Sequence, residues 1–270
     1  PILASKEIPP PPVTSQQHWR QALPLRYPCL STKEISSRLT PVLENIWKGV
    51  TETELLKADF HIHTEYSMDC NTPLEKIIER CLEVGINCIA VSDHGTIEGA
   101  MEMQRLSPFS VIVAEEVLTP HGEVMGMFLN ESIPGGLSAE ETVAQIKSQD
   151  GLVCIPHPFD ALRPSALNAK IVEEIAGQID IMEGFNSRNP FTHNATKIQA
   201  FAEKHGLVQS AGSDAHTLHE IGNAYVEMPE FEGRDDFLQA LGKGKIIGRK
   251  TNPLNHLYST WAKMKNIKGR

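Results

Sequence analysis

The sequence has few basic residues relative to acidic ones, and it has no long apolar run. Its 270 residues include 25 Lys and Arg against 34 Asp and Glu, which gives a formal net charge of −9. This acidic balance argues against a general binder of nucleic-acid duplexes or anionic membranes, although a local basic pocket is compatible with it. No stretch approaches the roughly 20 consecutive apolar residues that a membrane span needs.

Cysteine is also scarce, and the five cysteines form neither a CxxC pair nor the spacing of a disulfide framework. Cys88 and Cys154 fall inside apolar runs, so we expect them in the core. The N-terminus lacks the basic and then apolar pattern of a signal peptide, and it begins with Pro, so the initiator Met is absent or processed. These features predict a reduced, cytoplasmic protein.

The two ends of the chain differ in composition from its middle. Near the N-terminus, "IPPPPVTSQ" should be extended, and "STKEISSRLTPVLENIWKGV" begins with a capping box formed by Ser31 and Glu34. We therefore interpret residues 1–54 as a Pro-rich and helical extension and residues 55–250 as the main domain. Residues 251–270 are interpreted as a locally basic tail, and three roles stay open for it: packing on or near this domain through Leu257 and Trp261, helping to hold substrate, or solvation. Its last residues are expected to be solvated.

From about residue 55, short β-rich runs alternate with helical patterns. "ADFHIH" precedes the helical "PLEKIIERCLEVG", "CIAVSD" precedes "TIEGAMEMQRL", and later examples include "LVCIP" and "DIMEGF". Strands that alternate with helices predict an α/β architecture with parallel pairing. About seven such units favour a closed barrel over an open sheet.

Polar residues fall where these apolar runs end. "FHIH", "VSDH", "VAEE", "CIPH", "IMEGFN" and "SAGSDAH" all end with, or just after, a His, Asp or Glu. In an α/β barrel, the carboxyl ends of the strands converge on one face, where active sites form. Within "FHIH", the alternation of side chains along a strand places both imidazoles on one face, where they can bind one metal ion.

The strand ends supply five imidazoles and three carboxylates as candidate metal ligands: His61, His63, Asp69, His94, Glu116, His157, Asp214 and His216. One ion takes about four such ligands, so this set suits two or three ions with a bridging carboxylate. Imidazole and carboxylate without thiolate suit Zn²⁺, Mn²⁺ or Fe²⁺. Asp93 and Glu183 are expected to support these ligands instead of binding metal.

The motifs "HIHTEYSMD", "SDHGTIEG", "AEEV", "PHPF" and "GSDAH", in this order, resemble the PHP (polymerase and histidinol phosphatase) family over about residues 55–250. The resemblance implies a distorted (β/α)7 barrel, a two- or three-metal site at the C-terminal ends of its strands, and phosphoester hydrolysis. It further implies one ion bound by His61, His63, Glu116 and Asp214, a second by Asp69, His94 and His216, and a bridged third by Glu116 and His157. Glu116 matches the family's acid better than Glu115 because it precedes a β-branched residue.

These features favour a metal-dependent phosphoesterase in which a metal-bound hydroxide attacks phosphorus. No separate nucleophilic side chain stands out, and Asp214 and His216 are the candidates for assisting proton transfer. Arg188 and Arg163 are the candidates for binding the substrate phosphate, because a guanidinium pairs with phosphate bidentately. The acidic net charge favours a small phosphorylated substrate, with nucleotides and short oligonucleotides still open, and no stable binding of duplex nucleic acid is expected.

Two other functions compete with this one. His-x-His on a first barrel strand and an Asp after a late strand also resemble the amidohydrolase superfamily of amide hydrolases and deaminases. Those enzymes often bridge their metals with a modified lysine, whereas "VMGMFL" and "LVCIP" end without one. The third candidate is a non-catalytic metal-binding scaffold, which would be expected to have lost ligands.

Overall fold

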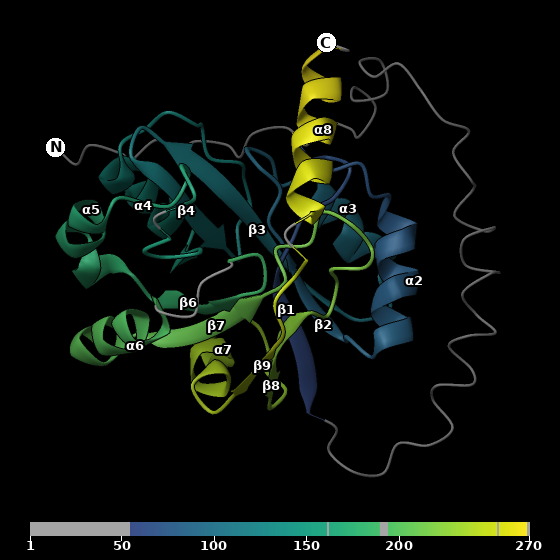
Figure 1. Ribbon diagram of the computed structural model, residues 1–270. Helices are drawn as coiled ribbons and strands as arrows, with labels where there is room; N and C mark the ends of the chain where they lie inside the picture. The colour runs from purple at the N-terminus through teal and green to yellow at the C-terminus, as the bar shows by residue number, and fades with distance from the viewer. Residues whose placement is uncertain (1–54, 161, 190–193, 253, 269–270) are drawn as a thin grey trace, which may run out of the picture. The chain divides into compact units, whose positions relative to one another are not determined.

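The computed structural model describes residues 55–160, 162–189, 194–252 and 254–268, and this part is a mixed sheet of nine strands with helices around it (Figure 1). The extension at residues 1–54, with its expected capping box, lies outside the described residues. The strands are β1 (Leu56–Ile62), β2 (Cys88–Val91), β3 (Ser110–Thr119), β4 (Gly122–Met127), β5 (Leu152–Ile155), β6 (Ile181–Asn186), β7 (Val208–Gly212), β8 (Ala224–Met228) and β9 (Lys245–Gly248). The helices are α2 (Leu74–Val84), α3 (Glu98–Leu106), α4 (Ala139–Ser148), α5 (Ala169–Glu174), the 3₁₀ turn η1 (Ala176–Gln178), α6 (Asn194–His205), α7 (Arg234–Leu241) and α8 (Asn255–Lys268).

The sheet has the strand order β7-β6-β5-β4-β3-β2-β1-β8-β9. The pairs β1–β2, β2–β3, β5–β6 and β6–β7 are parallel, as the alternation of strands and helices predicts. That prediction is wrong for β4, β8 and β9, which pair antiparallel with their neighbours. For β4 the reason is local, because only Pro120 and His121 separate it from β3, and a parallel pair needs a crossover of a dozen or more residues.

The barrel closes at the carboxyl end of β1. The backbone N–H of Asp214, just after β7, donates to the carbonyl oxygen of His61 at 2.8 Å, and the N–H of His63 donates to that of Ala215 at 3.0 Å. At the other end of β1, residues such as Ala58 pair instead with β8. Strands β1 to β7 therefore form a distorted α/β barrel that is closed on the side where the candidate ligands lie.

Two buried clusters separate the inside of the barrel from its outside. Small residues from the strands, including Ala58, Ala90 and Ala114, share the inner cluster with the fully buried Phe237 of α7. The outer cluster packs isoleucine and valine side chains of the strands against α2 to α6. Cys88 and Cys154 lie in the inner cluster, which confirms their predicted place in the core.

A bulge in β1 directs the two histidines of the His-x-His pair. Ala58 and Phe60 belong to the inner cluster, whereas Ile62, at the next even position, belongs to the outer one. The pairing of β1 with β2 shifts register between Asp59 and Ile62. Because a bulge exchanges the two faces of a strand, odd-numbered residues beyond it face the barrel interior. His61 and His63 are such residues.

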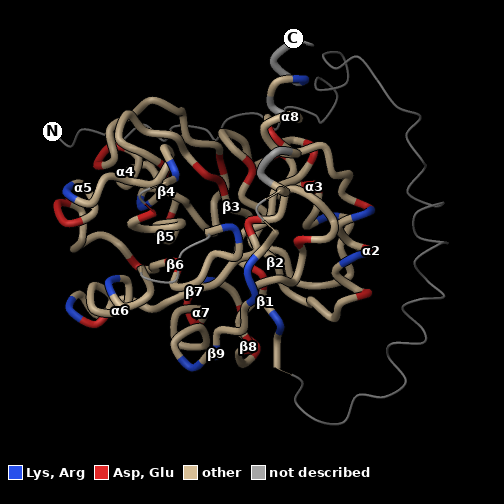
Figure 2. Tube along the Cα trace, viewed as in Figure 1, with Lys and Arg blue, Asp and Glu red and all other residues tan. Residues whose placement is uncertain are grey.

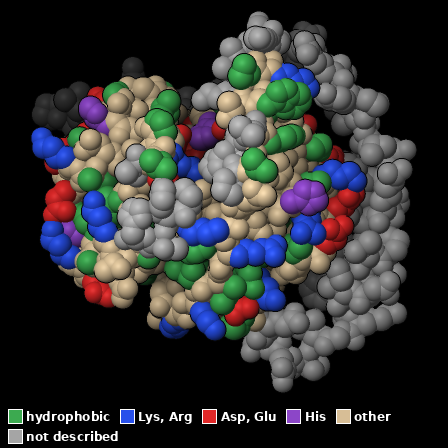
Figure 3. Space-filling model, viewed as in Figure 1, with side chains coloured by type: hydrophobic (Ala, Val, Ile, Leu, Met, Phe, Trp, Pro, Cys, Tyr) green, Lys and Arg blue, Asp and Glu red, His purple; other side chains and the backbone are tan. Residues whose placement is uncertain are grey.

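The C-terminal segment, for which the sequence predicts no helix, forms the helix α8. Trp261 is 55% exposed and the next residue, Ala262, is fully buried, whereas the side chain of Leu257 lies outside the described residues. Hydrophobic side chains are visible on the side of α8 shown in Figure 3. Within the described ranges, no helix is both long enough and apolar enough to cross a membrane.

Candidate metal centre

The carboxylate of Glu116 lies among four imidazoles. Its Oε2 lies 3.3 Å from His61 Nε2 and 3.4 Å from His63 Nε2. The same oxygen is 3.5 Å from His94 Nδ1, and Oε1 is 3.0 Å from His157 Nε2. Glu116 is buried, with 1% of its surface exposed, so these contacts replace water around the carboxylate. A carboxylate in this position can bridge two ions.

The alternation of side chains along β3 separates Glu116 from Glu115 (acidic residues are red in Figure 2). Ile112 and Ala114 face the barrel interior, so Glu116, at the next even position, faces it too. Glu115 points to the other face, where its Oε2 accepts a hydrogen bond from the N–H of Ile133 at 2.9 Å. The geometry therefore places Glu116, and not Glu115, at the centre.

Asp214 completes a first group of ligand atoms with His61 and His63. Its Oδ1 lies 3.7 Å from His61 Nε2 and 3.5 Å from His63 Nε2, and the three ligand atoms lie within 4.8 Å of one another. Asp214 has a φ of 54° and His157 a φ of 32°, both in the left-handed region that non-glycine residues seldom adopt. Backbone strain of this kind clusters at functional sites.

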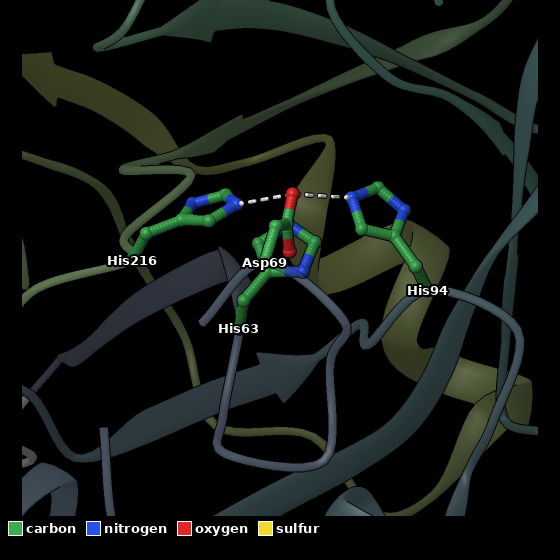
Figure 4. A group of neighbouring side chains, drawn as sticks. All are labelled: His63, Asp69, His94 and His216. Atoms are coloured by element: carbon green, nitrogen blue, oxygen red, sulfur yellow. Dashed lines mark ion pairs between the residues drawn. The ribbon is translucent and has the colours of Figure 1, made fainter. Parts of the chain in front are cut away.

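A second group gathers around Asp69 and is shown in Figure 4. Its Oδ2 lies 3.3 Å from His94 Nε2 and 3.2 Å from His216 Nε2, so the two imidazoles approach the carboxylate from opposite sides. His63 lies between them and belongs to this group as well as to the first. The hydroxyl of Ser67 donates to Asp69 Oδ1 at 2.8 Å, which fixes the carboxylate in its loop.

A third group contains Glu123, which the sequence analysis missed. Its Oε1 lies 3.6 Å from His94 Nδ1 and its Oε2 lies 3.4 Å from His157 Nε2, and it groups with His94 and Glu116. Glu123 lies near the start of β4, and because β4 is antiparallel, this start lies at the same rim as the carboxyl ends of the parallel strands. The two-residue connection from β3 is the signal that predicts such a hairpin.

Glu183 supports the ligands on the β6 side. Its Oε1 lies 2.9 Å from His61 Nδ1, and its Oε2 accepts hydrogen bonds from the N–H of His157 at 2.5 Å and from Asn186 Nδ2 at 2.9 Å. A hydrogen on His61 Nδ1 directed to Glu183 leaves the Nε2 lone pair facing the cluster. This arrangement of a carboxylate behind a histidine is typical of metal sites.

Three other buried acids hold the backbone around the centre. Asp93 accepts hydrogen bonds from the N–H and hydroxyl of Thr64, both at 2.6 Å, so it supports the chain after His63 instead of a ligand side chain. Glu220 Oε2 accepts from the N–H of His216 at 3.1 Å. Asp59 accepts from backbone groups after β7. The sequence analysis missed Asp59 and Glu220, because their partners are set by tertiary contacts.

The two arginines predicted to bind phosphate both reach the centre. Arg163 Nη2 lies 2.6 Å from Asp214 Oδ2. Arg188 Nη1 lies 2.7 Å from His216 Nδ1 and 3.9 Å from Asp214 Oδ1. The guanidinium groups of Arg163 and Arg188 therefore both lie close to Asp214, a candidate metal ligand.

The buried charges of the cluster shift the pKa values of their neighbours. Burial lowers the pKa of His61, but Glu116 and two further carboxylates outweigh it and raise this pKa well above its usual value. Burial raises the pKa of Glu116, but the imidazoles, that of His61 foremost, hold it well below its usual value. Burial also raises the pKa of Asp214, and Arg163 and His61 outweigh it and hold that pKa low. The carboxylates of the centre are thus ionised and attract cations.

The donor atoms of this cluster fit divalent ions. Within the described part of the chain, Asp214 Oδ1 and Glu123 Oε2 are buried without a hydrogen-bond partner. His61 Nε2 and His63 Nε2 lie 3.1 Å apart, so only one of the two nitrogens can carry a hydrogen toward the other. Unpaired carboxylate oxygens and opposed imidazole nitrogens are both satisfied by a metal ion, and this set of donors suits Mn²⁺, Zn²⁺ or Fe²⁺.

Comparisons of the sequence with known proteins find the same family that the motifs resemble. Residues 59–114 match the PHP domain, and residues 192–246 match a PHP-associated domain. Protein MJ0417 of Methanocaldococcus jannaschii is 30% identical over 217 residues, which cover 76% of this chain and 88% of that protein. Protein MJ1587 of the same organism is 37% identical over 145 residues, which cover 49% of this chain and 82% of that protein.

Solved structures share the fold. A two-domain protein from Bacteroides vulgatus, described as containing a predicted PHP-like metal-dependent phosphoesterase, aligns with a TM-score of 0.60 at 15% identity, over 74% of this chain and 70% of that chain. PsfC from Pseudomonas syringae aligns with a TM-score of 0.56 at 14% identity, over 80% of this chain and 100% of that chain. The order of the motifs, the barrel and these likenesses agree, and the chain belongs to the PHP family.

Proposed function

We propose that the protein is a metal-dependent phosphoesterase that hydrolyses a small phosphate ester. The observation that carries the proposal is the environment of Asp214, whose Oδ1 faces the imidazoles of His61 and His63 while its Oδ2 contacts Arg163. The carboxylate of Asp214 is therefore in contact with two candidate metal ligands, His61 and His63, and with Arg163, the candidate for binding phosphate. A phosphoryl group held between them would meet positive charge on both sides, as its transfer requires.

The candidate ligands divide into sets that share Glu116. We infer that His61, His63, Glu116 and Asp214 would hold one ion, that Asp69, His94 and His216 would hold a second, and that Glu116, His157 and Glu123 would hold a third. When bound, divalent ions supply charge that activates water and stabilises the oxygens of a phosphoryl group in transfer. The chain itself supplies the positions of these ligands, through supports such as Glu183.

The arginines are proposed to bind and orient the substrate phosphate. Arg163 is 17% exposed at its side chain and lies at the rim, whereas Arg188 is buried and fixed by several contacts. A guanidinium offers donors in a planar fork that matches two phosphate oxygens. Arg163 would thus release Asp214 Oδ2 and engage substrate, while Arg188 presents a donor that is already in place.

Asp214 and His216 are proposed to assist proton transfer, because both side chains face the imidazole cluster. Asp214 Oδ1 is buried without a hydrogen-bond partner among the described residues, so it can accept a hydrogen bond from a reacting water. Its low pKa keeps it ionised across the neutral range. His216 is the other candidate, since its Nδ1 lies 2.9 Å from the carbonyl oxygen of Asp214, which orients the ring.

The cavity beside the centre supports a small substrate. It has a volume of about 140 Å³, and its lining includes His157, Glu183, Asn186, Asn194 and Lys250. A cavity of this size accommodates a compact leaving group. The mixture of carboxamide, ammonium and apolar groups is compatible with a sugar phosphate or a nucleotide.

The test is phosphate release from a panel of sugar phosphates, nucleotides, nucleoside bisphosphates and short oligonucleotides, with Mn²⁺, Zn²⁺ or Fe²⁺ and with EDTA. We expect metal-dependent release from at least one member, and about a tenfold higher KM for it in Arg163→Lys, because lysine cannot form the bidentate contact. A parallel panel of amides and aminopurines serves as the control. Hydrolysis or deamination there, with no phosphate released from any ester, would contradict the proposal.

A further inference from the structure

The buried Arg188 connects the metal centre to the C-terminal helix α8. It lies in the loop after β6, and only 4% of its surface is exposed. Its Nη2 donates a hydrogen bond to the hydroxyl of Ser259 at 2.9 Å and approaches the carbonyl oxygen of Asn255 at 3.4 Å. Both acceptors belong to α8, which Figure 1 shows in yellow. The helix therefore contacts a residue that reaches the centre.

A second element holds the same guanidinium from another direction. Arg188 Nε lies 3.3 Å from Glu220 Oε1, and Glu220 is fully buried in the segment between β7 and β8. Its other oxygen accepts hydrogen bonds from the N–H groups of His216 and Thr217. The charge of Arg188 is thus balanced by Glu220, and Glu220 in turn fixes the loop that carries His216.

These two contacts determine the direction of the third nitrogen. A guanidinium is planar and rigid, so fixing Nε and Nη2 also fixes Nη1. Nη1 is the nitrogen that lies 2.7 Å from His216 Nδ1 and 3.9 Å from Asp214 Oδ1, at the edge of the metal centre. Without α8, rotation of the group about the contact to Glu220 would turn Nη1 away from that edge.

We propose that α8 forms part of the phosphate-binding site and that Ser259 is a positioning residue for Arg188. The ligand is the phosphoryl group of the substrate, so the inference rests on the proposed function. Ser259 does not touch the substrate. It holds the guanidinium in the orientation that phosphate binding needs, and so lowers the cost of ordering a long side chain when the ligand arrives.

Replacement of Ser259 by alanine tests this role without disturbing the helix. Alanine has a higher helix propensity than serine, so Ser259→Ala leaves α8 at least as stable as a helix. The variant removes one acceptor from Arg188 and leaves its charge partner, Glu220, in place. We expect KM for the substrate found in the panel to rise about fivefold to tenfold, with kcat changed less than twofold, because binding of the phosphate is weakened before the chemical step.

Two further variants separate positioning from a general structural effect. Ser259→Thr keeps the hydroxyl and should restore KM to within about twofold of the wild type. In an Arg188→Lys background, Ser259→Ala should change KM little, because the coupling needs the guanidinium. Ser148→Ala, the same change on the exposed end of α4, is the matched control and should leave KM unchanged.

Binding of inorganic phosphate tests the inference without catalysis. Calorimetry of the full chain, with Mn²⁺ and separately with EDTA, should show about fivefold to tenfold weaker phosphate binding in Ser259→Ala than in the wild type and in Ser148→Ala. If this holds while the wild type hydrolyses no ester, the positioning role stands and the proposed function fails. Equal phosphate affinity and equal KM in Ser259→Ala and the wild type would overturn the inference.

Discussion

Asp59 Oδ1 accepts a hydrogen bond from the backbone N–H of Ser213 at 2.8 Å, across 154 residues of sequence. The other oxygen of Asp59 accepts from the N–H of Gly222 at 3.2 Å. This fully buried carboxylate on β1 thus fixes both ends of the segment that carries Asp214 and His216. His61 and His63, at the carboxyl end of β1, are thereby held against Asp214 and His216, so the relative position of these four candidate ligands depends on this contact.

Replacing Asp59 should therefore destabilise the barrel. Asp59→Asn keeps the shape but places an NH₂ group where an oxygen accepts a hydrogen bond, which leaves a buried donor unpaired. We expect the free energy of unfolding to fall by about 2 to 4 kcal/mol, measured by urea denaturation. The exposed Asp150→Asn is the control, because asparagine tolerates the positive φ of this position, and it should change stability by less than about 0.5 kcal/mol. Equal effects of the two variants would contradict this role for Asp59.

The closure of the barrel also requires a glycine at position 212. A Cβ on Gly212 would lie 2.2 Å from His61 Cβ and 2.9 Å from Glu183 Oε1, so β1 and β7 would have to separate. We expect Gly212→Ala to lower the free energy of unfolding by about 3 kcal/mol or more, and therefore to lower the melting temperature strongly. Gly177→Ala, where a Cβ meets nothing within 4 Å, should leave the melting temperature almost unchanged. An unaltered melting temperature for Gly212→Ala would refute the close contact.

Glu123 is predicted to hold a metal ion together with His94, His157 and Glu116. Glu123→Gln removes the negative charge and one donor oxygen, so the protein should bind about one ion fewer per chain. The count is obtained by elemental analysis after dialysis against limiting Mn²⁺. Glu131→Gln, an exposed change nearby in sequence, is the control, and the same metal content in both variants would exclude Glu123 as a ligand.

Local sequence signals predicted most of the fold and most of the centre. The β-rich run "LVCIP" contains β5, because a short apolar run is a property of the segment itself. The structure brings together the candidates at strand ends, from His61 to His216, because carboxyl ends of barrel strands converge whatever their sequence. The division of these residues into sets of ligands comes from the family resemblance alone and stays a prediction.

Features set by pairing between distant segments escaped prediction. The direction of β4 follows from its partner strands, and with that direction Glu123 reaches the rim. Asp59 and Glu220 look like ordinary polar residues in the sequence, since their partners are backbone groups that only the fold brings near. The contact between α8 and Arg188 is likewise tertiary. The basic tail leaves a role in holding substrate open, but its sequence does not indicate a contact with Arg188.

Metal binding should release protons and strengthen as the pH rises. Without ions, nearby carboxylates outweigh burial and raise the pKa of His63 to about 10, and that of His61 is raised too. The pair therefore holds a proton at pH 7, and an ion that binds these nitrogens must displace it. Calorimetry with Mn²⁺ in two buffers of different ionisation enthalpy should show about one proton released, with affinity rising from pH 6 to pH 8. Affinity that does not change over this range would contradict the assignment.

Metal-dependent phosphoesterase activity is tested most directly by measuring phosphate release from the best ester of the panel by the wild type and by Asp214→Asn, in Mn²⁺ and in EDTA. Release should stop with the chelator and fall at least about 100-fold in the variant, since Asp214 contacts both the imidazole cluster and Arg163. The exposed Asp235→Asn should match the wild type. Two results would contradict this activity. One is undiminished phosphate release by a folded Asp214→Asn, and the other is no phosphate release by a wild-type protein that has bound two or more ions.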